Sequence, residues 1–195
     1  MKFKYSILIF IILFPISIFI WQILESGYYI FLVEASSFFL QIYNIELTSI
    51  EILKDGNTLA SFISNQIFPF SKEVRLSTFV EINNLASITF NIPLTISILI
   101  ALSLSNRFYI KEFLEAIFLL FILHLVTLDI SILKILTEAS HFKIAFSDYF
   151  VPSFQVLSSI ELFLINYLIK AEPFLIGGFL LFRRGVIKFD LEKYK

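Results

Sequence analysis

The sequence predicts an all-α membrane protein, a four-transmembrane-helix bundle with an interfacial helix and a small extracytoplasmic β element. Three observations predict this fold class. The chain of 195 residues is 58% apolar, whereas soluble domains are about 45–50% apolar. The apolar residues lie in long runs almost free of charge, which is typical of helices in lipid. One stretch near the middle instead alternates apolar and polar residues, as strands do.

The first apolar run, Tyr5–Leu24, predicts a transmembrane anchor over residues 1–24. A helix of this length spans about 30 Å, the thickness of the hydrocarbon layer. A cleavable signal peptide is the alternative, but it needs a shorter apolar core and a small-residue cleavage site. Residues 22–28 offer a poor site, so the sequence favours a retained anchor.

Residues 25–84 are expected to form an extracytoplasmic segment. It begins with the apolar run Tyr28–Tyr43, in which Glu34, Ser37 and Gln41 recur at helical spacing. The run is short for a membrane span, so we expect an amphipathic helix that lies at the outer membrane surface. A short fifth span is the alternative.

The rest of this segment predicts a β hairpin and a third strand. Asp55-Gly56-Asn57 is a turn signal between the β-prone stretches Ile45–Leu53 and Thr58–Ser64. Residues 74–82 then alternate apolar and polar side chains, the pattern of a half-buried strand. A sheet this small is marginal alone, so we expect it to pack on the surface helix or on a partner.

A three-helix transmembrane region is expected over residues 85–182, followed by a basic cytoplasmic tail at 183–195. The three expected spans are Leu85–Ser105, Phe113–Leu133 and Glu161–Phe182. Pro93 lies in the outer half of the first of them. Because proline lacks a backbone N–H, we expect a kink there.

The positions of lysine and arginine predict the orientation. With four spans, nine of these residues lie on the cytoplasmic side and five lie in the longer outer loops. A fifth span would move the C-terminal group of five to the outside. The charges therefore favour four spans with both termini in the cytoplasm.

Composition argues against several classes of function. A net charge of −1 gives no basic field for nucleic acid. The absence of cysteine excludes a thiolate nucleophile, a cysteine metal site and a disulfide. Two histidines disfavour a histidine-rich metal site, and the chain has neither a Gly-x-Ser-x-Gly elbow nor a glycine-rich phosphate loop. We therefore expect no enzyme, no cofactor and no bound metal.

Ionisable residues inside the spans are candidate functional residues, since they are costly in lipid. His124 and Glu172 each lie eleven residues from the cytoplasmic edge of their span, at a depth of roughly 16 Å. With Lys170, and with Asn91 nearby, they form a candidate intramembrane polar cluster that relays protons or binds a polar group. The alternative is structural: Lys170 and Glu172 neutralise each other and lock two helices, or Lys170 extends outward to the interface.

Asp129, Lys134 and Glu161 form a second polar group at the outer ends of the last two spans. Asp129 and Lys134 are five residues apart and pair poorly within one helix. Contacts across helices or with lipid headgroups are expected, and a structural role is favoured. Near the cytoplasmic end, Gly177 and Gly178 permit close helix packing, although local flexibility explains them equally well.

Several parts of the chain follow one another in an order that carries a family resemblance. An anchor and a small outer β segment precede the strand Thr78–Asn84. The span that contains Asn91-Ile92-Pro93-Leu94 follows, then a short basic turn, two more spans and the terminal Arg183-Arg184. This layout resembles the exosortase-associated membrane proteins, in particular those that accompany the exosortase H type.

The resemblance implies an accessory role beside an exosortase in a bacterial inner membrane. Exosortases process C-terminal sorting signals on exported proteins with a cysteine nucleophile, which this chain lacks. The implied partners are the lipid bilayer and an exosortase-like membrane protein, within a protein-sorting or exopolysaccharide export system. A subunit of a small transporter or channel that uses the His124–Glu172 layer is the alternative, and an intramembrane enzyme is a third. An adjacent exosortase gene favours the first, and adjacent transporter genes the second.

Overall fold

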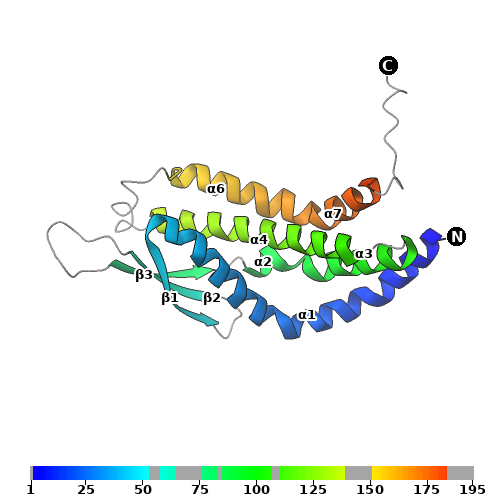
Figure 1. Cartoon of the computed structure of the whole chain (residues 1–195). Helices are drawn as coiled ribbons and strands as arrows, with labels where there is room; N and C mark the ends of the chain where they lie inside the picture. Colours follow the sequence, from blue (N-terminus) through cyan, green and yellow to red (C-terminus); the bar gives the residue numbers. More distant parts are fainter. Residues whose placement is uncertain are drawn as a thin grey trace, which may run out of the picture.

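Four long apolar helices with a small sheet at one end make up the structure, a computed structural model (Figure 1). It describes residues 2–52, 58–64, 76–82, 85–106, 110–138 and 151–183. The segments long and apolar enough to cross a membrane are Tyr5–Tyr43, Leu85–Leu104, Lys111–Glu138 and Phe154–Arg183. They confirm the predicted number of long apolar helices in the described part of the chain. The first helix begins and the last helix ends at one end of the bundle, opposite the sheet.

Helix α1, Lys2–Leu40, is continuous, so the predicted division into an anchor and a separate interfacial helix is wrong. Three residues, Glu25-Ser26-Gly27, separate the two apolar runs, and the single glycine costs a helix only about 1 kcal/mol. The second half continues because its apolar side is buried: Leu32 and Val33 are fully buried against α4 and the sheet. It also continues in the same direction, which argues against a fifth span. At 39 residues α1 is about 58 Å long, and Figure 1 shows it bending as it passes the other helices.

The chain leaves α1 through the short 3-10 helix η1, Gln41–Tyr43. Asn44 ends it in the left-handed conformation, with φ at 55°, and donates its N–H to the carbonyl of Gln41. Asparagine tolerates this conformation better than most residues, so it commonly ends helices. This turn leads directly into the first strand.

The three predicted strands are confirmed as β1 (Ile45–Ile52), β2 (Thr58–Ser64) and β3 (Leu76–Ile82). They form an antiparallel sheet in the order β1-β2-β3, with a bulge between Leu47 and Ser49. The predicted turn at residues 55–57 lies outside the described residues. One face is buried through side chains exposed by at most 2%, namely Ile45, Ala60, Phe62, Val80 and Ile82. As expected, this sheet packs on the second half of α1, and also on α4.

The predicted kink at Pro93 is confirmed as a break between two helices. Helix α2, Leu85–Thr89, stops before Phe90 and Asn91, and α3, Ile92–Asn106, follows. Pro93 has no N–H for the carbonyl of Thr89, so the α-helical ladder fails at this point. The break leaves the Asn91 side chain free to reach another helix.

The last two helical segments are longer than predicted. Helix α4 runs Ile110–Glu138. The last segment consists of α6 (Phe154–Phe163), the π-helical η2 (Leu164–Ile169) and α7 (Lys170–Arg183). The predicted outer ends are Leu133, directly before Lys134, and Glu161. The side chains of Lys134 and Glu161 pair with each other, so both helices continue through them.

The buried apolar residues form two groups with a polar layer between them. The larger core joins the second half of α1, the sheet, α2 and the sheet-side half of α4. The smaller core joins α3, α4 and α7 through Ile92, Leu99, Ala116, Leu120, Ile176 and Leu180. Trp21 and Tyr28 on α1 pack against both. Where the two cores meet, the buried side chains include polar ones.

Candidate functional site

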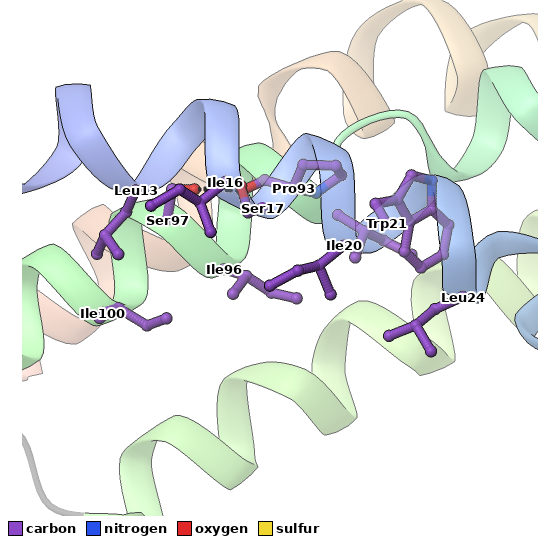
Figure 2. Close-up of a pocket in the computed structure, with 11 residues that line it drawn as sticks. Leu13, Ile16, Ser17, Ile20, Trp21, Leu24, Pro93, Ile96, Ser97 and Ile100 are labelled. Carbon is purple, nitrogen blue, oxygen red and sulfur yellow. Dashed lines mark hydrogen bonds between the residues drawn. The ribbon is translucent and has the colours of Figure 1, made fainter.

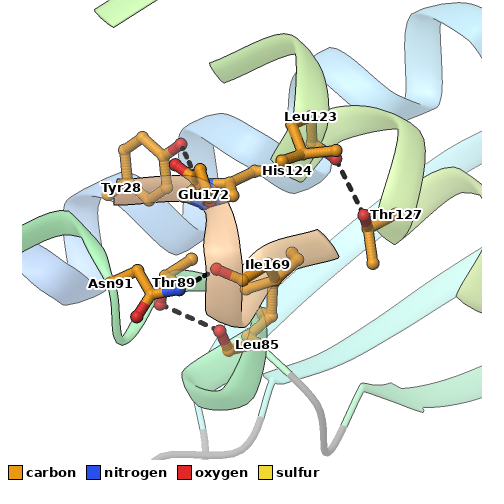
Figure 3. A network of polar contacts seen from close by, with 9 residues as sticks. All are labelled: Tyr28, Leu85, Thr89, Asn91, Leu123, His124, Thr127, Ile169 and Glu172. Carbon is orange, nitrogen blue, oxygen red and sulfur yellow. Dashed lines mark hydrogen bonds and ion pairs between the residues drawn. The ribbon is translucent and has the colours of Figure 1, made fainter. Parts of the chain in front are cut away.

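A chain of two hydrogen bonds joins three helices between the two cores (Figure 3). The Tyr28 hydroxyl on α1 lies 2.9 Å from Nδ1 of His124 on α4. Nε2 of the same ring lies 3.2 Å from Oε2 of Glu172 on α7. His124 is fully buried and Glu172 is 1% exposed. Tyr28 is only partly buried. We call these three residues the buried triad, after its two fully enclosed members.

Aromatic contacts hold the Tyr28 ring in place. Its ring meets the His124 ring edge-on, with centroids 6.1 Å apart, and the Trp21 ring at 5.3 Å. Edge-to-face contacts of this kind are favourable and orient the rings. The hydroxyl is thus directed at the imidazole by packing as well as by its hydrogen bond.

Sequence reasoning placed His124 and Glu172 in one cluster but missed Tyr28. The sequence prediction places Tyr28 in a helix on the outer surface, whereas the continuity of α1 brings it into the bundle. A hydroxyl at the start of an apolar run was the only available signal. The role of Tyr28 depends on tertiary packing and not on any local sequence pattern.

The two carboxylate oxygens of Glu172 differ in their contacts. Oε1 is buried and has no hydrogen bond among the described residues. An unpaired buried polar atom costs free energy, and an unpaired charge costs far more. Oε1 is therefore an acceptor at which the site can take a further hydrogen-bond donor.

Asn91 lies beside the buried triad but bonds the backbone instead. Its side-chain amide donates to the main-chain carbonyl of Ile169, the last residue of η2 (Figure 3). In an α-helix that carbonyl would accept from residue 173, which is a proline and has no N–H. Asn91 therefore ties the α2–α3 break to the irregular part of the last helix.

Lys170 is not part of the buried triad. Its side chain is exposed, and Nζ lies 3.1 Å from Oδ1 of Asn166 one turn away. Lys170 and Glu172 are two residues apart, which places them about 200° apart around a helix. The structure therefore shows no neutralising Lys170–Glu172 pair, and Lys170 extends outward.

The outer polar group divides into two contacts across helices. Lys134 on α4 pairs with Glu161 on α6, and both are largely buried, with side chains 19% and 5% exposed. Asp129 instead accepts a hydrogen bond from Ser36 on α1. Each contact links α4 to a different neighbour.

A second ion pair between helices lies at the other end of the bundle. Arg183 on α7 pairs with Glu115 on α4, with side chains 47% and 35% exposed. Glu115 and Lys134 are nineteen residues apart on α4, a rise of roughly 28 Å, close to the hydrocarbon thickness of about 30 Å. His124 lies almost midway between them.

An apolar groove runs between α1 and α3 (Figure 2). It encloses about 130 Å³ and is lined by isoleucine and leucine side chains with Trp21 at one end. The hydroxyls of Ser17 and Ser97 lie 2.7 Å apart and both donate to the carbonyl of Pro93. These bonds satisfy the polar atoms there and join α1 to α3.

Protein-family models, curated proteins and solved structures gave no match to this chain. Within the described ranges, no three histidine, aspartate or glutamate side chains gather closely enough to hold a metal ion. The buried triad, with its unpaired carboxylate oxygen, is the candidate site that the side-chain geometry supports best.

Proposed function

We propose that this chain is an accessory interaction subunit of a bacterial inner membrane, acting beside an exosortase-type protein-sorting or exopolysaccharide export system. One observation carries the proposal. The first half of α1 packs along α3 and leaves most of its apolar surface uncovered. Ten of its large apolar side chains are at least 45% exposed: Tyr5, Ile7, Leu8, Ile11, Ile12, Ile16, Phe19, Ile20, Ile23 and Leu24.

An uncovered apolar helix supports docking inside a bilayer. Lipid covers such a surface, yet it is also the surface on which a helix of another membrane protein packs. The small sheet adds a second surface at the opposite end of the bundle. In the described sheet, β1 and β3 each have a neighbouring strand on one side only, and an open edge accepts an added strand.

The arrangement of the ends supports the proposed orientation. The start of α1 and the end of α7 lie at the end of the bundle opposite the sheet. Lysine and arginine are densest near those termini, which favours the cytoplasm for them. The sheet then faces outward, where exported proteins and their sorting machinery meet.

Site-specific photo-crosslinking in the native host tests the proposal. A benzophenone amino acid replaces Phe19 on α1 or Phe174 on α7, two phenylalanines of similar exposure, 65% and 68%. The expected result is a crosslink from position 19 to an exosortase-like membrane protein, and only lipid adducts from position 174. Lipid adducts alone at position 19 in the assembled protein would refute the proposed docking face.

A subunit of a small transporter or channel is the second candidate. The observation in its favour is the buried Glu172 beside His124, with one carboxylate oxygen unpaired. Such intramembrane groups often lie on ion or proton pathways. Vesicles that contain the protein should then show a proton or ion flux that Glu172→Gln abolishes. No flux above that of empty vesicles would remove this candidate.

A further inference from the structure

The buried triad lies in surroundings that offer little to balance a charge. Helices α2 and α3 carry no ionisable side chain. Among the described residues, the ionisable groups nearest to the triad along its own helices are Tyr29 and Glu25 on α1, Asp129 on α4, and the exposed Lys170 on α7. The paired cations Lys134 and Arg183 lie at the levels of the two ion pairs, each roughly 14 Å along the bundle from the triad.

An ionised Glu172 beside a neutral imidazole would leave one net negative charge in this apolar interior. A bare buried charge is strongly disfavoured, and a buried carboxyl takes up a proton instead. One added proton makes the triad neutral overall, either as a carboxylic acid with a neutral ring or as an imidazolium–carboxylate pair. From this geometry we propose that Tyr28, His124 and Glu172 form a proton-binding site, in which Glu172 takes up and releases a proton through His124.

The hydrogen bonds accommodate both protonation states. In the ionised state the Tyr28 hydroxyl donates to Nδ1, and the Nε2 proton of His124 is donated to Oε2 of Glu172. When Tyr28 receives a proton, it passes its own to Nδ1, and Nε2 passes its proton to Oε2. Tyr28 is again a neutral phenol, and the carboxylic acid now donates to Nε2. One proton has entered, and both hydrogen bonds are kept with their directions reversed.

A proton fits this site better than a metal cation. Metal ions such as Mg²⁺ or Ca²⁺ need about six or more oxygen ligands around them. In the described part of the chain, Glu172 Oε1 is the unpaired oxygen at this site, and the neighbouring Ile169 carbonyl is already bonded to Asn91. A proton needs a single lone pair. The site goes beyond the proposed docking role and does not depend on it.

Labelling with dicyclohexylcarbodiimide tests the proposal, because this apolar reagent reacts with protonated carboxyl groups in apolar surroundings. The carboxyl O–H adds across one C=N bond, so that the oxygen bonds to carbon and the proton moves to nitrogen. The acyl group then shifts to nitrogen and gives a stable acylurea. The full chain in detergent micelles should gain an adduct at Glu172, located by peptide mass spectrometry. Labelling should fall at least tenfold as the pH is raised.

Matched variants separate the proposal from a general effect on folding. Glu172→Gln should lose the adduct, whereas Glu115→Gln, which removes the partly exposed carboxylate paired with Arg183, should keep it. His124→Gln should shift the pH midpoint of labelling, since it removes the imidazole that bonds to the Glu172 carboxyl group in both protonation states. Far-ultraviolet circular dichroism checks that each variant is folded.

Three results would overturn the inference. The first is a folded wild-type protein that stays unlabelled at Glu172 over the whole pH range. The second is a pH profile that is the same in wild type and in a folded His124→Gln variant, which would leave Glu172 as an isolated acid. The third is protection from labelling by sodium chloride and not by potassium chloride, which would make the site a sodium site.

Discussion

The side-chain amide of Asn91 donates a hydrogen bond to the main-chain carbonyl of Ile169, which Pro173 leaves without its α-helical donor. Two prolines thus create one contact. Pro93 breaks the helix that carries Asn91, and Pro173 frees the carbonyl that Asn91 bonds. Asn91 is 1% exposed and Ile169 fully buried, so no bulk water replaces this bond.

Replacing Asn91 with leucine should destabilise the protein by about 1–3 kcal/mol, because a buried carbonyl loses its partner. Pro173→Ala supplies an N–H for the same carbonyl. The double variant should therefore lose less stability than the sum of the two single variants. Unfolding in mixed micelles measures all four proteins, and strict additivity in this cycle would contradict the proposed link.

The hydrogen bond from Ser36 to Asp129 should contribute more to stability than the hydrogen bond made by the adjacent Ser37. Ser36 is fully buried and joins α1 to α4, whereas the Ser37 hydroxyl bonds only the Glu34 carbonyl on its own helix. Ser36→Ala should cost about 1–3 kcal/mol, since a carboxylate loses a donor. Ser37→Ala should change the unfolding free energy by less than about 0.5 kcal/mol. Equal effects in thermal unfolding would show that the contact between helices contributes nothing.

The two ion pairs between helices should contribute differently. Lys134 and Glu161 are largely buried, but Arg183 and Glu115 are partly exposed. Breaking a buried pair leaves a buried charge without a partner, at a cost of about 3–5 kcal/mol, whereas exposed pairs contribute about 0–1 kcal/mol.

Glu161→Gln should accordingly lower the unfolding free energy several times more than Glu115→Gln. Raising the salt concentration should reduce the loss of unfolding free energy in Glu115→Gln and leave the loss in Glu161→Gln unchanged. Unfolding at two salt concentrations measures both. A larger loss in Glu115→Gln would contradict the burial that the structure shows.

The two adjacent glycines of α7 should respond differently to alanine. A Cβ on Gly177 would lie 3.2 Å from Cγ2 of Ile98 on α3, whereas a Cβ on Gly178 would meet nothing within 4 Å. Alanine gains about 1 kcal/mol of helix propensity over glycine, and Gly178→Ala should keep that gain. Gly177→Ala should melt at a lower temperature than Gly178→Ala, because Ile98 has to move. A lower melting temperature for Gly178→Ala than for Gly177→Ala would contradict the close contact between Gly177 and Ile98.

Local patterns predicted most of the secondary structure, because helix and strand periods repeat over a few residues. The alternation at residues 74–82 marked a strand that the structure contains, and Pro93 marked a break. Nothing local says whether two apolar runs join, so the continuity of α1 was missed, and with it the place of Tyr28. That continuity depends on the packing of Leu32 and Val33 against distant elements.

The candidate site was only partly predictable for the same reason. Depth within the spans paired His124 with Glu172, since both lie at the same level of adjacent helices. Depth ignores direction around the helix axis, and that omission placed the outward-facing Lys170 in the cluster. The partner of Asn91 is a main-chain carbonyl, which no side-chain pattern reveals. Lys134 and Glu161 were both placed at the outer ends of their spans, and the structure pairs them.

The absence of cysteine allows a direct test of orientation with single-cysteine variants. Lys111 lies at the start of α4 and Glu51 lies near the end of β1, and both are exposed. If the sheet faces outward, a membrane-impermeant maleimide should label Glu51→Cys in intact spheroplasts, and Lys111→Cys only after permeabilisation. The opposite labelling would place the sheet in the cytoplasm. The outer docking role would then fail, whereas the buried triad would keep its geometry, because its contacts are independent of which end of the bundle faces the cell interior.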